Sequence, residues 1–246
     1  MKLKKILKGI RLNRYLAHSG VSSRRTSETF IKTGIVEING KIVKEPGYRV
    51  FPNDRVKFYN RFLYPEEKVY ILLNKPKGFI TTTRDEKNRK TVMDLVSNAS
   101  PYRLYPVGRL DKQTTGVLLF TNNGDLAEKM IHPKYKIRKI YHVRLNRKFK
   151  IFDFETIKKG INFPEGKAKI DVISYIPGIP KNRVSLTLHI GWNRIVRRIF
   201  EYLGYKIVNL DRISFCGLTK KSLKKGQWRI ITEKERKSLE KFVSQK

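Results

Sequence analysis

The sequence predicts two domains, a small N-terminal unit and a larger α+β domain built on a mostly antiparallel sheet. Hydrophobic residues make up 39% of the 246 residues and recur along the whole chain, so there is enough apolar material for packed cores. Residues 61–68, with Pro65 and two glutamates, show no hydrophobic period and are typical of a linker. Beyond them, turns and helices both join the expected strands without regular alternation, which favours α+β over a doubly wound parallel sheet. We therefore expect domains at 1–60 and 69–246.

Two short helices are expected first. Apolar residues at helical spacing begin at Leu12, and Gly20 ends this helix. Ser22 or Ser23 can cap a second helix, which ends at Gly34.

A small antiparallel sheet completes the N-terminal unit. Residues 35–38 alternate like a strand, Asn39-Gly40 is a strong hairpin signal, and 42–43 begin the return strand. A last strand is expected over 56–59.

The second domain shows more elements, which we predict from period and from flanking turn residues. The expected strands are 69–73, 79–83, 116–121, 140–145, 168–175, 184–190, 207–213 and 228–231. The expected helices are 91–96, 125–131, 152–158, 195–203 and 233–242.

The charge indicates a nucleic-acid partner. Lys and Arg number 55 against 21 Asp and Glu, a net charge of +34. Residues 1–60 hold fourteen basic and four acidic residues and the remainder 41 and 17, so the excess is spread along the chain. An AT-rich genome inflates lysine, but it does not account for acids outnumbered more than two to one. A spread positive surface suits a phosphate backbone.

Several other classes are disfavoured. One cysteine excludes a disulfide framework, and four scattered histidines make a metal site improbable. No phosphate-binding or dinucleotide-binding glycine loop and no nucleophile elbow is present, which disfavours the chemistries that those motifs serve. No membrane span, signal-peptide core, basic amphipathic helix or DNA-recognition helix is recognisable. We expect a cytoplasmic protein that binds neither membrane nor DNA.

One loop carries the strongest catalytic signal, Gly108-Arg109-Leu110-Asp111-Lys112-Gln113-Thr114-Thr115-Gly116. Arg109 can pair with Asp111 and keep the carboxylate ionised, while the threonines can donate hydrogen bonds. A carboxylate on a basic surface that faces RNA would weaken RNA binding, so its presence there suggests a function. The alternative interpretation is an ordinary Asx-turn before a strand.

Two further segments converge on RNA. Tyr141 lies among cations in Arg138-Lys139-Ile140-Tyr141-His142, a pattern suited to stacking a splayed base, or else it is an ordinary strand tyrosine. The run from Gly191 to Phe200 opens a helix with three arginines that can hold phosphates, or else it is a solvated basic face.

These motifs together resemble a known family. Arg11-Leu12-Asn13-Arg14-Tyr15-Leu16, Ser22-Ser23-Arg24-Arg25 and Val36-Glu37-Ile38-Asn39-Gly40 resemble an S4 RNA-binding domain. Leu73-Asn74-Lys75-Pro76-Lys77-Gly78, Val107-Gly108-Arg109-Leu110-Asp111 with its apolar strand, Lys139-Ile140-Tyr141-His142-Val143 and Asn193-Arg194-Ile195-Val196-Arg197-Arg198 resemble the S4-bearing bacterial ribosomal RNA pseudouridine synthases. They occur in the family's order from about residue 10 onward.

The resemblance implies roles for individual residues. Asp111 would be the catalytic aspartate, Tyr141 the tyrosine that packs on the target base, and Arg197 the arginine that pairs with Asp111. Substrate and RNA contacts would come from Arg109, Lys75, Arg194, Arg198, Arg14, Arg24 and Arg25. Ile190, Ile195, Asn123 and Thr115 depart from the usual residues, and Ile195 puts one RNA contact in doubt.

The resemblance further implies isomerisation of a uridine in ribosomal RNA, without metal or cofactor. The run from His132 to Tyr141 is more similar to the members that act on the large subunit (23S) than on the small. Free ribosomal RNA or a pre-ribosomal particle is the expected partner, and a monomer the expected state. Whether the aspartate acts as nucleophile or base stays open. The alternative is a non-catalytic S4-type ribosome-assembly factor, which needs neither Asp111 nor so long a second domain.

Overall fold

A computed structural model describes residues 9–244, and the chain divides into two compact units at the junction of Lys68 and Val69. Each unit has its own core and is described by itself.

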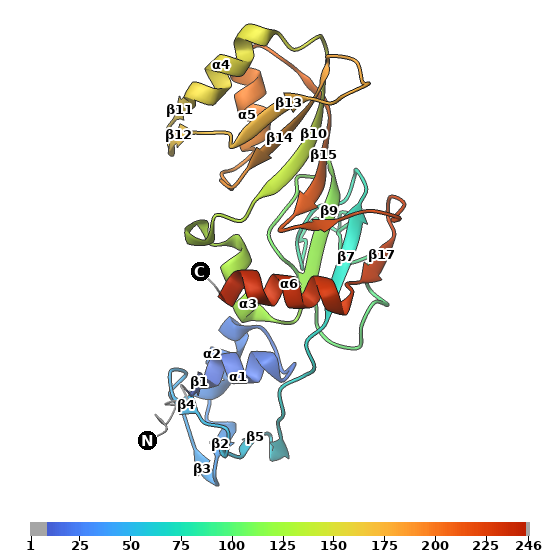
Figure 1. The fold of residues 1–246 in the computed structure, drawn as a ribbon. Coiled ribbons are helices and arrows are strands. Elements are labelled where there is room, and N and C mark those ends of the chain that lie inside the picture. Colours follow the sequence, from blue (N-terminus) through green and yellow to red (C-terminus); the bar gives the residue numbers. More distant parts are fainter. Residues whose placement is uncertain (1–8, 245–246) are drawn as a thin grey trace, which may run out of the picture. The chain divides into compact units, whose positions relative to one another are not determined.

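The first unit combines two helices with two small sheets (Figure 1). Its elements are β1 (Ile10–Arg11), α1 (Leu12–His18), α2 (Arg24–Lys32), β2 (Val36–Ile38), β3 (Lys41–Ile42), β4 (Arg49–Val50), β5 (Val56–Phe58) and β6 (Arg61–Phe62). The strands pair in the orders β3-β2-β5-β6 and β1-β4. The core consists of Leu12, Leu16, Ile31, Val36, Ile38, Val50 and Val56.

Local chemistry explains these elements. The Ser23 hydroxyl caps α2 by accepting a hydrogen bond from the Thr26 amide at 3.1 Å. Asn39 and Gly40 both have positive φ angles, 52° and 80°, which a two-residue hairpin turn requires. The linker was expected to start at residue 61, but residues 61–62 form strand β6 and pair with β5.

The second unit is built on a nine-stranded sheet. Its strands are β7 (Tyr70–Lys75), β8 (Tyr105–Pro106), β9 (Thr114–Thr121), β10 (Lys139–Leu145), β11 (Ile161–Phe163), β12 (Gly166–Ala168), β13 (Val172–Tyr175), β14 (Arg183–Leu188), β15 (Ile207–Phe215), β16 (Leu218–Thr219) and β17 (Trp228–Ile230). Its helices are α3 (Gly124–Ile131), the 3₁₀ turn Pro133–Tyr135, α4 (Ile151–Lys159), α5 (Ile195–Tyr202) and α6 (Glu233–Ser244). The main order is β13-β14-β10-β15-β9-β7-β17, with β8 and β16 on β9 and β15, while β11 and β12 form a separate hairpin.

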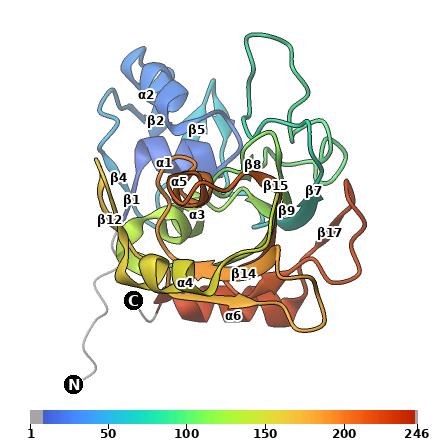
Figure 2. The ribbon, with the colours of Figure 1, turned by 90° about the horizontal axis from the view of Figure 1, so that it is seen from above.

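Helices cover both faces of this sheet, so its central strands are buried throughout. All residues of β7 and β9 are buried. Alternate residues of these strands pack with α3 and α6 on one face and with α4 and α5 on the other. The two views show β15, β9 and β7 side by side, and α3 next to α6 (Figures 1 and 2).

One pairing in this sheet differs from the rest. β15 runs parallel to β9, whereas its other long neighbour, β10, is antiparallel to it, as the mostly antiparallel prediction requires. Gly116 faces Arg212 at this seam with φ at +109°, and a Cβ on it would lie 2.1 Å from the Arg212 carbonyl oxygen. The absence of a side chain at Gly116 therefore allows β15 to lie against β9.

Three expected elements differ in the structure. Residues 79–83 form no strand, because only Ile80 bridges to Thr91. Residues 91–96 form consecutive turns and no helix: the Asp94 carboxylate accepts from the Thr91 amide at 2.7 Å and holds the chain in a turn. The expected strand 168–175 is two strands, since β12 pairs with β11 and β13 with β14.

Candidate active site

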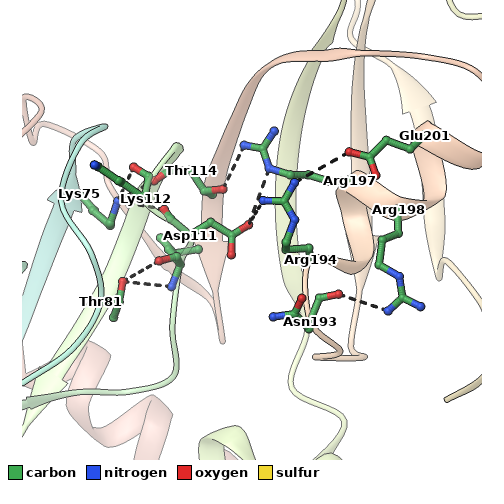
Figure 3. Close-up of polar contacts among 11 residues, drawn as sticks. Lys75, Thr81, Asp111, Lys112, Thr114, Asn193, Arg194, Arg197, Arg198 and Glu201 are labelled. Atoms are coloured by element: carbon green, nitrogen blue, oxygen red, sulfur yellow. Dashed lines mark hydrogen bonds and ion pairs between the residues drawn. The ribbon is translucent and has the colours of Figure 1, made fainter. Parts of the chain in front are cut away.

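The Asp111 loop, residues 108–113, is held from several sides before it enters β9. The Thr81 hydroxyl donates to the Leu110 carbonyl at 2.7 Å and accepts from the Leu110 amide at 3.2 Å. The Asp111 carbonyl accepts from the Thr114 amide at 3.0 Å. These bonds fix the backbone and leave the Asp111 carboxylate, 36% exposed, free to face the opposite wall (Figure 3).

Lys75 braces this loop from beneath. Its side chain is fully buried, and Nζ donates to the carbonyls of Pro76, Asp111, Lys112 and Thr114 at 3.0, 3.1, 3.3 and 3.0 Å. Burial lowers the pKa of Lys75 to about 8, although the Asp111 charge opposes this shift. The expected RNA contact for Lys75 is therefore wrong, because every donor direction is occupied within the protein.

Arg197 and Arg194 face the Asp111 carboxylate from the start of α5 (Figure 3). Oδ2 lies 3.7 Å from Nε of Arg197 and 4.0 Å from Nη1 of Arg194, which are ion-pair distances rather than hydrogen bonds. Arg197 is only 12% exposed and its Nη2 lies 3.5 Å from the Thr114 hydroxyl. Burial lowers the pKa of Arg197, and the Asp111 charge counteracts this. The expected partner Arg109 makes no ion pair with Asp111 in the described structure.

Tyr141 lies on β10 and lines the same cleft as Asp111 and Arg197. The cleft has a volume of about 170 Å³. Tyr141 is 8% exposed, and across the sheet it pairs with Leu186 and Arg212. The three residues that the sequence singled out for catalysis thus surround one space, although they come from β10, α5 and the loop before β9.

A wider groove opens beside this cleft and shares the Asp111 loop with it. Arg109 and Lys112 are exposed on one side, and Arg194 and the half-buried Trp192 lie on the other. Asp111 is the acid among these groove-lining residues, so the surface is strongly positive.

Arg198 differs from its two neighbours on α5. Its guanidinium pairs with both carboxylate oxygens of Glu165, at 2.7 and 2.9 Å, and stacks on Phe163 at 4.6 Å. In Figure 3 its side chain points away from Asp111. The RNA contact expected for Arg198 stays a prediction, and in this structure its guanidinium is held by Glu165.

The three arginines expected to bind RNA in the first unit lie on its helices. Arg24 and Arg25 are exposed in the first turn of α2, and Arg14 is half-buried on α1. Within residues 9–244, no helix is long and apolar enough to span a membrane, and no group of three or more His, Cys, Asp or Glu side chains could hold a metal ion.

Both units of the chain match known protein families. Residues 69–202 match the RNA pseudouridylate synthase family model, and residues 10–56 match the S4 domain. The chain belongs to the RNA pseudouridylate synthase family. It is 40% identical to the ribosomal large subunit pseudouridine synthase B of Bacillus subtilis, over 93% of this chain and 95% of that protein. It is 35% identical to the protein of the same name from Buchnera aphidicola, over 89% and 92%.

A solved structure supports the same assignment. A crystal structure of a pseudouridylate synthase, 27% identical, superposes with a TM-score of 0.65 and covers 94% of this chain and 99% of that one. The protein is thus an isomerase, an S4-bearing RNA pseudouridylate synthase with an α+β catalytic domain, as the sequence predicted.

Three residues of this RNA pseudouridylate synthase site were not predicted. Thr81 fixes the Asp111 loop, and Lys139 and Arg212 line the cleft. The Lys139 ammonium donates to the carbonyls of His189 and Ile190, and burial lowers its pKa to about 8. A signal for Arg212 existed, since an arginine inside a buried strand needs an explanation.

Proposed function

We propose that this enzyme converts a specific uridine of large-subunit (23S) ribosomal RNA to pseudouridine, with Asp111 as the catalytic group. The observation that carries this proposal is the position of the Asp111 carboxylate, which lies within 4.0 Å of two arginines at a cleft that Tyr141 also lines. The names of the Bacillus and Buchnera relatives support large-subunit ribosomal RNA as the substrate.

The target uridine must leave its stack to reach a cleft of this size. The Tyr141 ring offers its face to the flipped base, replacing stacking lost in the RNA. The wider groove, with Arg109, Lys112 and Arg194, suits the phosphates on either side of the target.

Asp111 faces the sugar in this arrangement. The isomerisation breaks the bond between uracil N1 and C1′ and forms one between C5 and C1′. The carboxylate acts either as a nucleophile at C1′ or as a base toward the sugar. Arg197 lies 3.7 Å from this carboxylate, and a bound base that displaces water from the cleft strengthens that pairing.

The first unit adds RNA affinity through its basic surface, which includes Arg24 and Arg25. A net charge of +34 supports binding either to free ribosomal RNA or to a pre-ribosomal particle. We propose that the enzyme acts there as a monomer in the cytoplasm.

Mapping pseudouridines in ribosomal RNA tests the function. Cells without the gene should lack one 23S pseudouridine, the parent gene should restore it, and Asp111→Asn should not. Asp111→Asn keeps the size of the side chain and removes its charge. An unchanged pseudouridine map, with RNA binding intact, would favour the non-catalytic assembly factor instead. Restoration by Asp111→Asn, with hydrolysis of the amide excluded, would remove Asp111 from the mechanism.

A further inference from the structure

Arg212 is a buried cation whose charge the mechanism above does not use. It lies on β15, is 2% exposed, and contributes to the wall of the cleft. The register places it opposite Tyr141 on β10 and Gly116 on β9, where the missing side chain of Gly116 leaves it room.

The contacts of Arg212 hold its guanidinium against the cleft. Nε donates to the Val117 carbonyl at 2.8 Å, and the guanidinium carbon lies 4.6 Å from the centre of the Phe215 ring. Burial lowers the pKa of Arg212, and the Tyr141 hydroxyl opposes this shift. Phe215 and Tyr141 both line the cleft, so the guanidinium lies on an aromatic ring at the wall of this space.

No anion compensates this charge. None of the ion pairs in the described part of the chain includes Arg212, and its Nη2 is buried without a hydrogen-bond partner. Arg197 differs, because it faces the Asp111 carboxylate. An unpaired buried cation opposes folding, but it lowers the free energy of any negative charge brought beside it.

The isomerisation produces such a charge. When the N1–C1′ bond breaks, its electron pair stays on uracil, which becomes an anion delocalised over N1, C5 and the carbonyl oxygens. The sugar carbon is satisfied by the Asp111 carboxylate or by loss of a sugar proton to it. The uracil then turns and its C5 donates a pair to C1′, as the Asp111–C1′ bond breaks in the first case or as the sugar proton returns in the second. The C5 proton then leaves and N1 gains one. Reactant and product are isomers, so no co-reactant is needed.

We propose that Arg212 is an electrostatic catalyst, which stabilises the negative charge on uracil while the base is detached from the sugar. The idea rests on the proposed function. A preorganised cation in a site that excludes water stabilises a developing anion strongly, because it need not reorient when the charge appears. Asp111 and Arg212 then have separate roles: the carboxylate reacts with the sugar, and the guanidinium stabilises the negative charge on the base.

The test compares uracil and 5-fluorouracil as the detached base, at the same position of one RNA sequence. Single-turnover rates of cleavage of the N1–C1′ bond are measured on an RNA with uridine at the mapped position and on the same RNA with 5-fluorouridine there. Fluorine occupies C5 in the second RNA, so no C5 proton can leave, and the comparison is confined to cleavage of that bond. Fluorine withdraws electrons and stabilises the uracil anion, so the reaction depends less on the protein's cation. We expect Arg212→Gln, which can still donate to Val117, to lower the uridine rate by roughly 10²–10³-fold. RNA affinity should change little, and the loss should be about tenfold smaller with 5-fluorouridine.

Three controls separate charge from structure. Arg212→Lys keeps the charge and should lose less than Arg212→Gln on uridine. Arg144→Gln removes an exposed arginine from the same strand as Tyr141 and should match the parent on both substrates. The ratio of the two rates from one preparation does not depend on how much of the protein is folded. If Arg212→Gln yields no folded protein, Arg212→Met, which buries no polar atom, replaces it.

An equal loss on uridine and 5-fluorouridine overturns the proposal, as does an unchanged uridine rate in Arg212→Gln. Neither result affects the proposed function, which stands or falls on whether the parent enzyme converts the uridine RNA at all.

Discussion

At the scale of single residues, the buried cations around the Asp111 cleft differ in what they bind. Lys75, Arg197 and Arg212 are all largely buried, yet each has a different partner: four backbone carbonyls, a carboxylate, or no anion. The pKa of Lys75 and of Arg197 falls because burial disfavours the charged form. Chemical identity alone therefore does not assign their roles, whereas their partners do.

Tyr141 should act mainly through its ring. Tyr141→Phe keeps the face that stacks on the base, so we expect RNA affinity and most of the stability to be retained. Tyr141→Ala should lose the stacking contribution, roughly 1–3 kcal/mol per base. Affinity for an RNA containing the target uridine measures both. A large loss of activity in Tyr141→Phe at unchanged affinity would instead assign proton transfer to the hydroxyl.

Arg197→Ala should slow the reaction without weakening RNA binding. Arg197 lies 3.7 Å from the Asp111 carboxylate, and its removal leaves that carboxylate without this cation. We expect the single-turnover rate at saturating RNA to fall by roughly 10²–10³-fold. Arg198→Ala is the matched control, since Arg198 pairs with Glu165. An equal loss of rate in both variants would contradict a specific pairing of Arg197 with Asp111.

Lys75 should make stability depend on alkaline pH. Its pKa is about 8 in the folded protein and 10.5 ordinarily, so between these values the unfolded chain binds the additional proton. Stability then rises with pH across that window relative to a variant without the group. Denaturant unfolding of the parent and Lys75→Met from pH 7 to 10 measures this (roughly the interval that the two pKa values span). A difference between the two proteins that does not vary with pH contradicts the assignment.

At the scale of elements, long periodic segments were predicted well and short turn-rich segments poorly. The strands expected at 116–121 and 140–145 and the helix at 195–203 were confirmed within one or two residues. Residues 91–96 carry an apolar pattern that suits a helix, but the Asp94 side chain competes for the backbone amides there. The spacing of apolar residues indicates which side chains are buried, but it does not reveal hydrogen bonds between a side chain and the nearby backbone.

The residues of the site also differ in how well the sequence predicted them. Asp111, Tyr141 and Arg197 were selected because their motifs resemble a family, and all three line one cleft. Lys75 and Arg198 were assigned to RNA from motifs of the same family, and the sequence does not show the carbonyls that bind Lys75 or the Glu165 carboxylate that pairs with Arg198. Arg212 was missed because its environment depends on two strands that pair only in the folded sheet.

The seam between β9 and β15 offers a prediction at this scale. Gly116→Ala places a Cβ 2.1 Å from the Arg212 carbonyl oxygen, at a φ that L-residues rarely adopt. Because the obstacle is backbone, we expect a loss of stability of roughly 2–4 kcal/mol, and loss of activity in any protein that folds. Gly40→Ala has a positive φ but open space around it, and should cost less. Thermal unfolding compares them, and equal losses would show that crowding at the seam is unimportant.

At the scale of the whole molecule, we expect two units with separate cores to divide binding from chemistry. Residues 1–60 carry fourteen basic and four acidic side chains, and the cleft that Asp111 lines lies entirely in the second unit. An electrostatic unit joined to a catalytic one adds affinity without altering the reacting groups.

Removal of residues 1–68 should separate these contributions. We expect a folded catalytic unit that binds ribosomal RNA less tightly and with a shallower dependence on salt, because fewer counterions are released. Single-turnover rates at saturating RNA should change less than affinity. Titrations at several salt concentrations measure the slope, and identical affinity and slope in both proteins would contradict a binding role for the first unit.

The parallel pairing of β9 with β15 also governs when the enzyme becomes active during folding. Thr115 on β9 bonds to Asp211 on β15, 96 positions later in the chain. Closing so long a loop is entropically unfavourable, so contacts of this span form late, after local hairpins and helices. Asp111 belongs to the early side of this seam, whereas Arg197 and Arg212 belong to the late side. A nascent chain that has not yet placed β15 between β10 and β9 lacks one wall of the Asp111 cleft, so on the proposed function we expect activity only after the sheet has closed.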